Sequence, residues 1–326
     1  MNGRLEKETQ FYERMEEKLK NLPSVIKEYY VSLRANRKSY TSIGVYISNV
    51  LHFARFLCGE NIQNDFYKDV QISDVESYFI SLEVRTTANG EKRVGDDILQ
   101  QRWSALRNFF DFLIKRGYLN SNPIIGVDKP KNQTEHSVTY LTKVEINKLL
   151  KAVEQNTSKI TAIRDKTFIS LGLATGMRVS AIVNINIDDI DFDNNIIRVI
   201  EKRKKVREIA IGNNIKVQLQ RWIQVRDDYF GELNTNAVFV SQKRDRLSDD
   251  AANKALKKYC EQAGINKKIT MHKLRSSAAC ALAKNNIPVK AIAKQLGHKQ
   301  ISTTMRYLDV FNEDVEKSKN ILDNLF

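Results

Sequence analysis

The sequence predicts a mainly α-helical fold with a small β-sheet, organised as two domains. The chain has 326 residues, enough for two ordinary domains of about 150 residues each. Hydrophobic residues make up 42% of it, so each domain can bury a core, while the scarcity of glycine (13) and proline (4) disfavours turn-rich all-β folds. In most segments apolar residues recur every three or four positions, which is the spacing of one helical face.

Helix signals dominate the first 120 residues. Ser39 is a predicted N-cap, and Ser73 with Glu76 has the spacing of a capping box. The expected helices cover residues 5–22, 24–35, 40–57, a short segment ending near 82, and 96–116. The polar stretch 85–95 contains an Asn-Gly turn signal.

A polar stretch with two of the four prolines, Pro123 and Pro130, separates two differently patterned regions and is typical of an interdomain linker. The predicted division is an N-terminal helical extension (1–23), a helical domain (24–122), a linker (123–140) and a second domain (141–326).

The second domain begins with a predicted capping box formed by Thr142 and Glu145. Gly176 is expected to stop a more apolar helix. This helix is expected over 164–175. The further expected elements are strands over 196–200 and 208–211 joined by a basic turn, helices from about 217, and a polar helix over 312–325.

The charge balance predicts a polyanionic partner. Lys and Arg number 53 and Asp and Glu 39, which leaves a net charge of +14. Such an excess is most simply matched by nucleic acid. No apolar run approaches the roughly 20 residues of a membrane span, and three scattered cysteines form neither a disulfide framework nor a zinc pattern. We therefore expect a cytoplasmic, nucleoid-associated protein.

Four short patterns in the second domain contain the residues most suited to chemistry. They are TGMRVS, a basic turn, HKLR, and LGH followed nine residues later by a tyrosine. Arginine forks match phosphate oxygens, histidines move protons near neutral pH, and an activated tyrosine is a covalent nucleophile. Neither a glycine-rich phosphate loop nor a carboxylate cluster is evident. The patterns together indicate phosphoryl transfer on a nucleic-acid backbone with no metal or nucleotide cofactor.

In order and spacing, TGMRVS, EKRKKVR, HKLR and LGHKQISTTMRY resemble the catalytic domain of the tyrosine recombinases, or phage integrase family, with the simple Xer-type recombinases as the nearest pattern. The segment QQRWSALRNFFDFLIKRGYLNSNP is similar to the helical, SAM-like core-binding domain of that family. The resemblance covers residues 24–310.

The resemblance implies a role for each of six residues in cutting and rejoining DNA. Arg178 and Arg275 clamp the scissile phosphate. His272 hydrogen-bonds it and assists proton transfer, and His298 supports it. Lys202 protonates the leaving 5′-oxygen. Tyr307 attacks and becomes a 3′-phosphotyrosine.

Further DNA contacts are expected from the rest of the basic turn, namely Arg203, Lys204, Lys205 and Arg207. One position departs from the family pattern: Ala181 stands where the family usually has Glu or Asp. Alone, each site residue except His298 has an ordinary explanation as a helix cap, a surface charge or a half-buried aromatic. It is their combination that favours a recombinase.

The resemblance also implies a C-shaped clamp around duplex DNA and a homo-tetramer on two specific sites. The last helix would dock on a neighbouring protomer, and accessory directionality proteins are candidate partners. The expected function is site-specific recombination, in integration, excision or dimer resolution. The alternatives are a catalytically silent DNA-binding relative, an enzyme resembling a type IB topoisomerase, and a non-enzymatic basic interaction protein.

Overall fold

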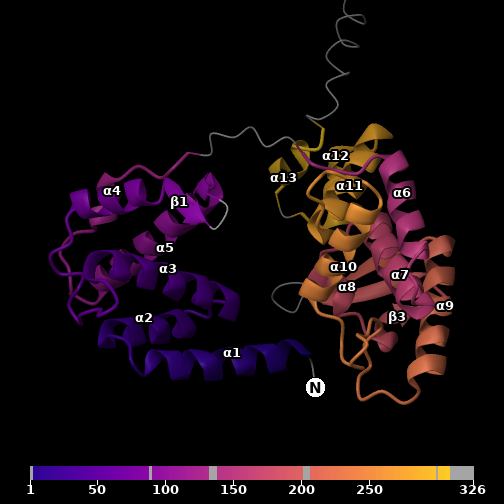
Figure 1. The fold of residues 1–326 in the computed structure, drawn as a ribbon, viewed down its shortest axis with the longest axis horizontal. Helices are drawn as coiled ribbons and strands as arrows, with labels where there is room; N and C mark the ends of the chain where they lie inside the picture. Colours follow the sequence, from indigo (N-terminus) through magenta and orange to yellow (C-terminus); the bar gives the residue numbers. More distant parts are fainter. Residues whose placement is uncertain (1–2, 88–89, 132–137, 201–205, 299, 309–326) are drawn as a thin grey trace, which may run out of the picture. The chain divides into compact units, whose positions relative to one another are not determined.

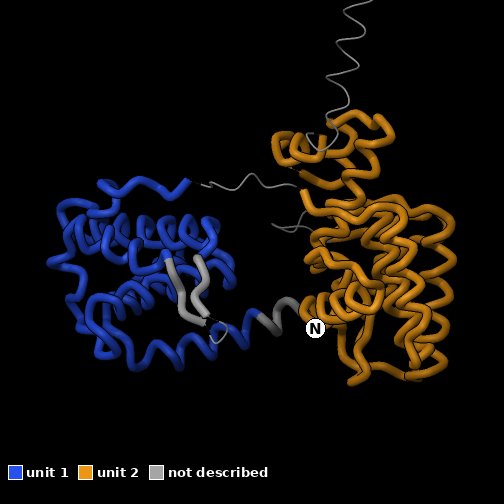
Figure 2. The backbone as a smooth tube through the Cα atoms, turned by 45° about the horizontal axis from the view of Figure 1, so that its top comes forward, with its two compact units in different colours: residues 1–136 blue, residues 137–326 orange. Residues whose placement is uncertain are grey.

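The computed structural model describes residues 3–87, 90–131, 138–200, 206–298 and 300–308. The chain forms two compact units (Figures 1 and 2): residues 1–136, here unit 1, and residues 137–326, here unit 2. In the described ranges, no helix combines the length and the apolar character needed to cross a membrane.

Unit 1 is a helical bundle with one small hairpin. Its elements are α1 (Gly3–Leu19), α2 (Ser24–Ala35), α3 (Tyr40–Cys58), α4 (Ile72–Ser81), β1 (Val84–Thr87), β2 (Gly90–Arg93), α5 (Asp96–Lys115) and the 3₁₀ turn η1 (Pro123–Gly126). Its core is aromatic: Phe53, Phe109 and Phe110 are fully buried between α3 and α5. The indole of Trp103 donates to the carbonyl of Val127 (2.9 Å), which fastens the end of this unit to α5.

The predicted helices of unit 1 are confirmed, with one correction to a cap. The Ser39 hydroxyl accepts from the backbone N–H of Ser42 (3.2 Å), as expected of an N-cap. The expected capping box of Ser73 and Glu76 is wrong, because the Asp74 carboxylate accepts from the backbone N–H of Gln71 (2.8 Å) and the helix begins at Ile72. The same three-residue spacing is satisfied two positions earlier. The polar stretch from 85 contains the paired strands β1 and β2.

Unit 2 is mostly helical and contains a small antiparallel sheet. Its elements are α6 (Lys143–Glu154), α7 (Lys159–Thr175), α8 (Val179–Val183), η2 (Ile187–Asp189), β3 (Ile190–Asp191), β4 (Ile196–Ile200), β5 (Val206–Ala210), α9 (Asn213–Phe230), α10 (Asp249–Gln262), α11 (Met271–Lys284), α12 (Val289–Leu296) and α13 (Ser302–Met305). The strand order is β3-β4-β5, with Ile197 opposite Ile209. Helix α7 packs against α6, α9, α10 and α11 (Figure 1).

The Thr142–Glu145 capping box and both long strands of unit 2 are confirmed. The expected helix over 312–325 lies outside the described residues. Because α7 is covered on several sides, even polar side chains along it are buried. These polar groups must find partners inside the unit.

A buried network on α7 predicts a large stability effect. The carboxylate of Asp165, 1% exposed, accepts from Arg164 Nε (2.8 Å) and from the Tyr259 hydroxyl (2.8 Å). We expect Asp165→Ala to lower the unfolding free energy of unit 2 by about 3–5 kcal/mol, since it leaves a buried arginine without its counter-charge. Urea unfolding followed by Trp222 fluorescence in a Trp103→Phe background measures the change.

The neighbouring surface pair is the control for this prediction. Lys166 contacts Glu154 at 2.5 Å, with both side chains partly in solvent. Lys166→Ala should change the unfolding free energy by less than about 1 kcal/mol. Equal losses for Asp165→Ala and Lys166→Ala would show that the network does not stabilise the unit.

Candidate active site

Arg178 is presented by a sharp turn between α7 and α8. Helix α7 ends at Gly176, whose φ of 64° lies in the left-handed region that glycine tolerates best. A Cβ added at Gly176 would overlap Cδ2 of Leu296, so the turn also requires glycine for close packing. Arg178 follows as the N-cap residue of α8, with an exposed side chain. Gly176 therefore sets where this guanidinium emerges.

Arg275 and His272 lie one turn apart on α11. Arg275 is only 2% exposed, and its Nη1 donates to the carbonyl of Gly176 (2.9 Å), the residue that forms the Arg178 turn. This bond across 99 positions ties the two arginine motifs together. His272, in the first turn of the same helix, lies at the surface.

His298 and Tyr307 face each other across a short loop. Helix α12 ends at Gly297, in the left-handed region with φ of 69°, as predicted. The Nδ1 of His298 hydrogen-bonds the hydroxyl of Thr304 (2.7 Å). The imidazole is stacked on the Tyr307 ring at 16°, with 6.2 Å between the ring centres. Tyr307 is 4% exposed and packs with Cys280 and other apolar side chains of α11 and α12.

Positive charge concentrates around the two histidines. Burial first, and then the nearby charges of Arg275, Arg178 and Arg306 with a smaller contribution from His272, together lower the pKa of His298 to about 4. The pKa of His272 is lowered first by partial burial and then by the same arginines and Lys273. Both imidazoles are therefore neutral at pH 7. Such a cluster suits a phosphate, whose negative charge would relieve the repulsion.

The structure thus brings together five of the six predicted site residues, all from unit 2. The sixth, Lys202, lies outside the described residues, as do Arg203, Lys204 and Lys205. Sequence reasoning missed Arg306, whose charge acts on both histidines, and Thr304, which is fully buried and bonds His298. The one signal for Arg306 in the sequence is its position next to Tyr307.

A model of the Phage integrase family matches residues 139–314, more than half of the chain. The chain belongs to the phage integrase family. It is 31% identical over 245 residues to the tyrosine recombinase XerC of Mannheimia succiniciproducens, covering 75% of this chain and 79% of that one. It is 29% identical over 304 residues to XerD of Staphylococcus saprophyticus, covering 92% and 98%. The predicted Xer-like type is confirmed.

Solved recombinases share the fold. XerH bound to a palindromic difH substrate after cleavage matches with a TM-score of 0.71 and 18% identity, over 89% of this chain and 82% of that one. A lambda integrase tetramer bound to a Holliday junction matches with a TM-score of 0.66 and 17% identity, over 87% and 76%. The predicted mainly α tyrosine-recombinase fold is confirmed.

Two other predicted positions of this phage integrase family member have packing roles. Ala181, at the position where the family usually has an acidic residue, is half-buried and packs against the main core of unit 2. Arg207, predicted as a DNA contact, donates from Nη2 to the carbonyls of Gln295 and Lys294 (3.3 Å to the latter) at the end of α12. Within the recombinase fold, Arg207 therefore joins β5 to the helix that precedes His298.

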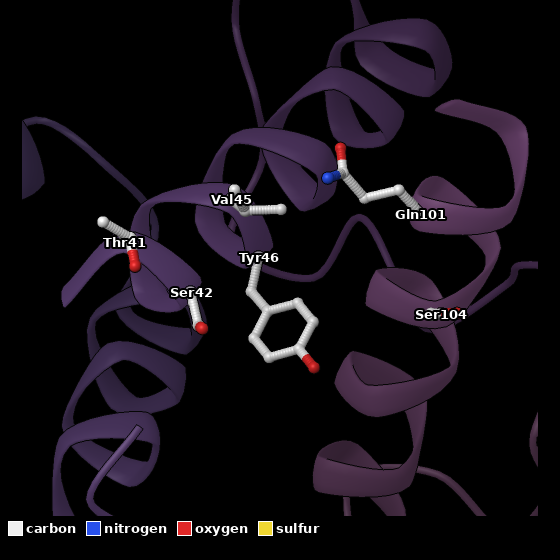
Figure 3. Close-up of a pocket in the computed structure, with 6 residues that line it drawn as sticks. All are labelled: Thr41, Ser42, Val45, Tyr46, Gln101 and Ser104. Atoms are coloured by element: carbon white, nitrogen blue, oxygen red, sulfur yellow. The ribbon is translucent and has the colours of Figure 1, made fainter. Parts of the chain in front are cut away.

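Unit 1 of the recombinase has a pocket between α3 and α5. Figure 3 shows Tyr46 and Gln101 projecting from the two helices into the space between them. Its lining residues are Thr41, Ser42, Val45, Tyr46, Gln101 and Ser104, none of them charged. The sequence signal is weak, since these positions have the pattern of an ordinary polar helix face.

The lowered histidine pKa values predict a pH-dependent stability. In the unfolded chain His298 titrates near its usual pKa of about 6.5, whereas in the folded chain its pKa is about 4. Between these values the unfolded state binds more protons, so the unfolding free energy should fall as the pH is lowered through this window. Urea unfolding at several pH values measures it. His298→Gln should show a shallower fall, and parallel curves for the two proteins would contradict the assignment.

Proposed function

We propose that this site-specific recombinase cuts and rejoins duplex DNA through a 3′-phosphotyrosyl intermediate formed on Tyr307. The observation that carries the proposal is the gathering of Arg178, Arg275 and two neutral histidines beside one tyrosine in unit 2. Fixed cations in a partly buried site can stabilise the charge that develops on a phosphodiester under attack.

In the proposed reaction, Arg178 and Arg275 hold the non-bridging oxygens of the scissile phosphate. The Oη of Tyr307 bonds to phosphorus as the bond to the 5′-oxygen breaks, and neutral His272 is suited to receive the phenolic proton. Lys202 gives a proton to the departing 5′-oxygen. A 5′-hydroxyl from another strand then attacks the phosphotyrosine and frees Tyr307, so no ATP is consumed.

The resting position of Tyr307 requires a movement before this attack. At 4% exposure Tyr307 lies in the apolar cluster of α11 and α12, which leaves little of the residue open to a DNA phosphate. We propose that DNA binding or assembly withdraws the segment around Tyr307 from this cluster. His298, which stacks on the ring, would then be released to the phosphate.

We further propose that residues 24–122 form the core-binding domain and residues 141–326 the catalytic domain, joined by the linker 123–140 and closing as a C-shaped clamp on DNA. The hydroxyl and amide groups that line the α3–α5 pocket suit a DNA-contacting role for residues 24–122, since such groups can read base edges in the major groove. A homo-tetramer on two sites, with the last helix docked on a neighbour and accessory directionality proteins as partners, is the proposed assembly. Its proposed location is the cytoplasm, on the nucleoid.

Covalent capture of DNA tests the function and identifies the target sequence in the same step. Purified protein is mixed with fragmented, nicked genomic DNA. The protein is then denatured, and the DNA that remains covalently attached to it is sequenced. We expect one or a few recurring sequences joined through a 3′-phosphate. DNA that binds but never attaches would identify a silent relative instead. Relaxation of supercoiled DNA without any recombinant product would favour an enzyme resembling a type IB topoisomerase.

The binding step should depend steeply on salt. A net charge of +14 on the chain predicts several phosphate contacts, each of which releases counterions. We expect the affinity for DNA to fall on the order of 10³-fold or more between 50 and 200 mM salt if at least six phosphates are contacted. Fluorescence anisotropy with a labelled duplex measures the slope. A flat log–log plot would contradict a basic DNA-binding surface.

A further inference from the structure

We infer that Arg207 is a positioning residue for His298 rather than a DNA contact, an inference that rests on the proposed function. The side chain of Arg207 leaves strand β5 and reaches the last turn of α12, residues 294–297, which is here called the α12 end. His298 is the next residue along the chain. Arg207 therefore holds the segment from which His298 enters the site.

The last four carbonyl groups of any helix have no N–H partner within the helix and need partners from elsewhere. At the α12 end, such partners are present. The Ala293 carbonyl accepts from the His298 N–H (2.9 Å), and that of Lys294 from the Gly297 N–H (3.1 Å). Arg207 supplies donors to the carbonyls of Lys294 and Gln295. A cation at this position also complements the negative end of the helix dipole.

The α12 end also packs on the rest of the site. Leu296, 1% exposed, lies against Gly176, which forms the Arg178 turn and accepts the hydrogen bond of Arg275. A shift of α12 would therefore move His298 relative to both arginines. Arg207 is half-buried in this arrangement, and its hydrogen bonds cross 87 and 88 positions of sequence.

The contact between Arg207 and the α12 end also involves the strand that follows Lys202 in the sequence. The first residue of β5, Val206, directly follows the basic residues 202–205, which include Lys202. Arg207 thus connects the strand that follows these residues to the helix leading to His298. The Nη2 of Arg207 is bonded to two backbone carbonyls, so this nitrogen is already engaged within unit 2 before any phosphate is bound.

Amide hydrogen exchange on the free full-length chain is the first test. In Arg207→Ala, the exchange of the Gly297 and His298 amides should accelerate roughly tenfold or more, the scale of losing a charge-assisted hydrogen bond. Arg207→Lys should recover part of the protection. The control is Arg198→Ala on the adjacent strand, where an exposed arginine pairs with Asp191 (3.3 Å) and Glu208 (3.5 Å). Unchanged exchange in Arg207→Ala would overturn the inference.

Cleavage of the captured DNA sequence is the second test. Arg207→Ala should slow formation of the covalent adduct at least tenfold, and Arg207→Lys should restore part of the rate. In a His298→Ala background, Arg207→Ala should add less than about a twofold loss, because the two residues act through one path. Full additivity would overturn the inference. So would weaker DNA binding with a salt slope reduced by about one, which is the mark of a phosphate contact.

The two tests separate the inference from the proposed function. If the wild-type chain forms no adduct with any DNA, the proposed function fails. Accelerated exchange at Gly297 and His298 in Arg207→Ala would still support the link between β5 and the α12 end. If the wild type forms the adduct and Arg207→Ala matches it in rate and exchange, only the inference fails.

Discussion

Replacing Tyr307 with phenylalanine is expected to abolish the covalent protein–DNA adduct while DNA binding persists. The change removes only the phenolic oxygen, the atom that is proposed to bond to phosphorus. The ring keeps its stacking on His298 and its place in the apolar cluster. Loss of a covalent nucleophile costs on the order of 10⁶ in rate where it has been removed from a hydrolase. We therefore expect no detectable adduct on a nicked duplex of the captured sequence.

The matched control makes the same change at an exposed tyrosine of the same unit. Tyr229, on α9, is 57% exposed, and Tyr229→Phe should trap DNA at the wild-type rate. Binding of both variants is compared by anisotropy, and their folding by thermal unfolding. If the adduct forms at the normal rate in Tyr307→Phe, another residue is the nucleophile. This result would also remove the basis for the proposed mechanism.

Arg178→Ala and Arg275→Ala are both expected to slow adduct formation by about 10²–10³-fold. Each variant removes a donor that is proposed to hold the scissile phosphate, and a loss of this size is typical of such donors. The two should differ in stability. Arg178 is exposed, so its replacement should change the unfolding free energy by no more than about 0.5 kcal/mol.

Arg275 has a structural bond as well as a proposed catalytic role. It is 2% exposed and donates to the Gly176 carbonyl, which Arg275→Ala would leave without this donor in a buried position. We expect a loss of about 1–3 kcal/mol in unfolding free energy. Urea unfolding and single-turnover trapping on the same preparations separate the two effects. Wild-type cleavage by either variant, or equal stability of the two, would contradict this assignment.

Local sequence signals predicted the features that depend on neighbouring residues. The Ser39 cap, the Thr142–Glu145 box and the Gly176 and Gly297 stops each involve groups within about five positions of one another. Their interactions depend mainly on neighbouring residues, so spacing was enough to predict them. The misplaced box at Ser73 shows the limit, since two local patterns with equal spacing competed and Asp74 formed the bond.

Residue patterns were sufficient for the helical class, the order of the four motifs and the family. Tertiary structure alone decided that Arg275 bonds the Arg178 turn, that Arg207 bonds the α12 end instead of projecting freely, and that Tyr307 lies buried beside His298. These contacts join residues up to 99 positions apart and depend on how α7, α11, α12 and β5 pack. Periodicity and spacing describe one element at a time. They do not specify which side chain of one element meets the backbone of another.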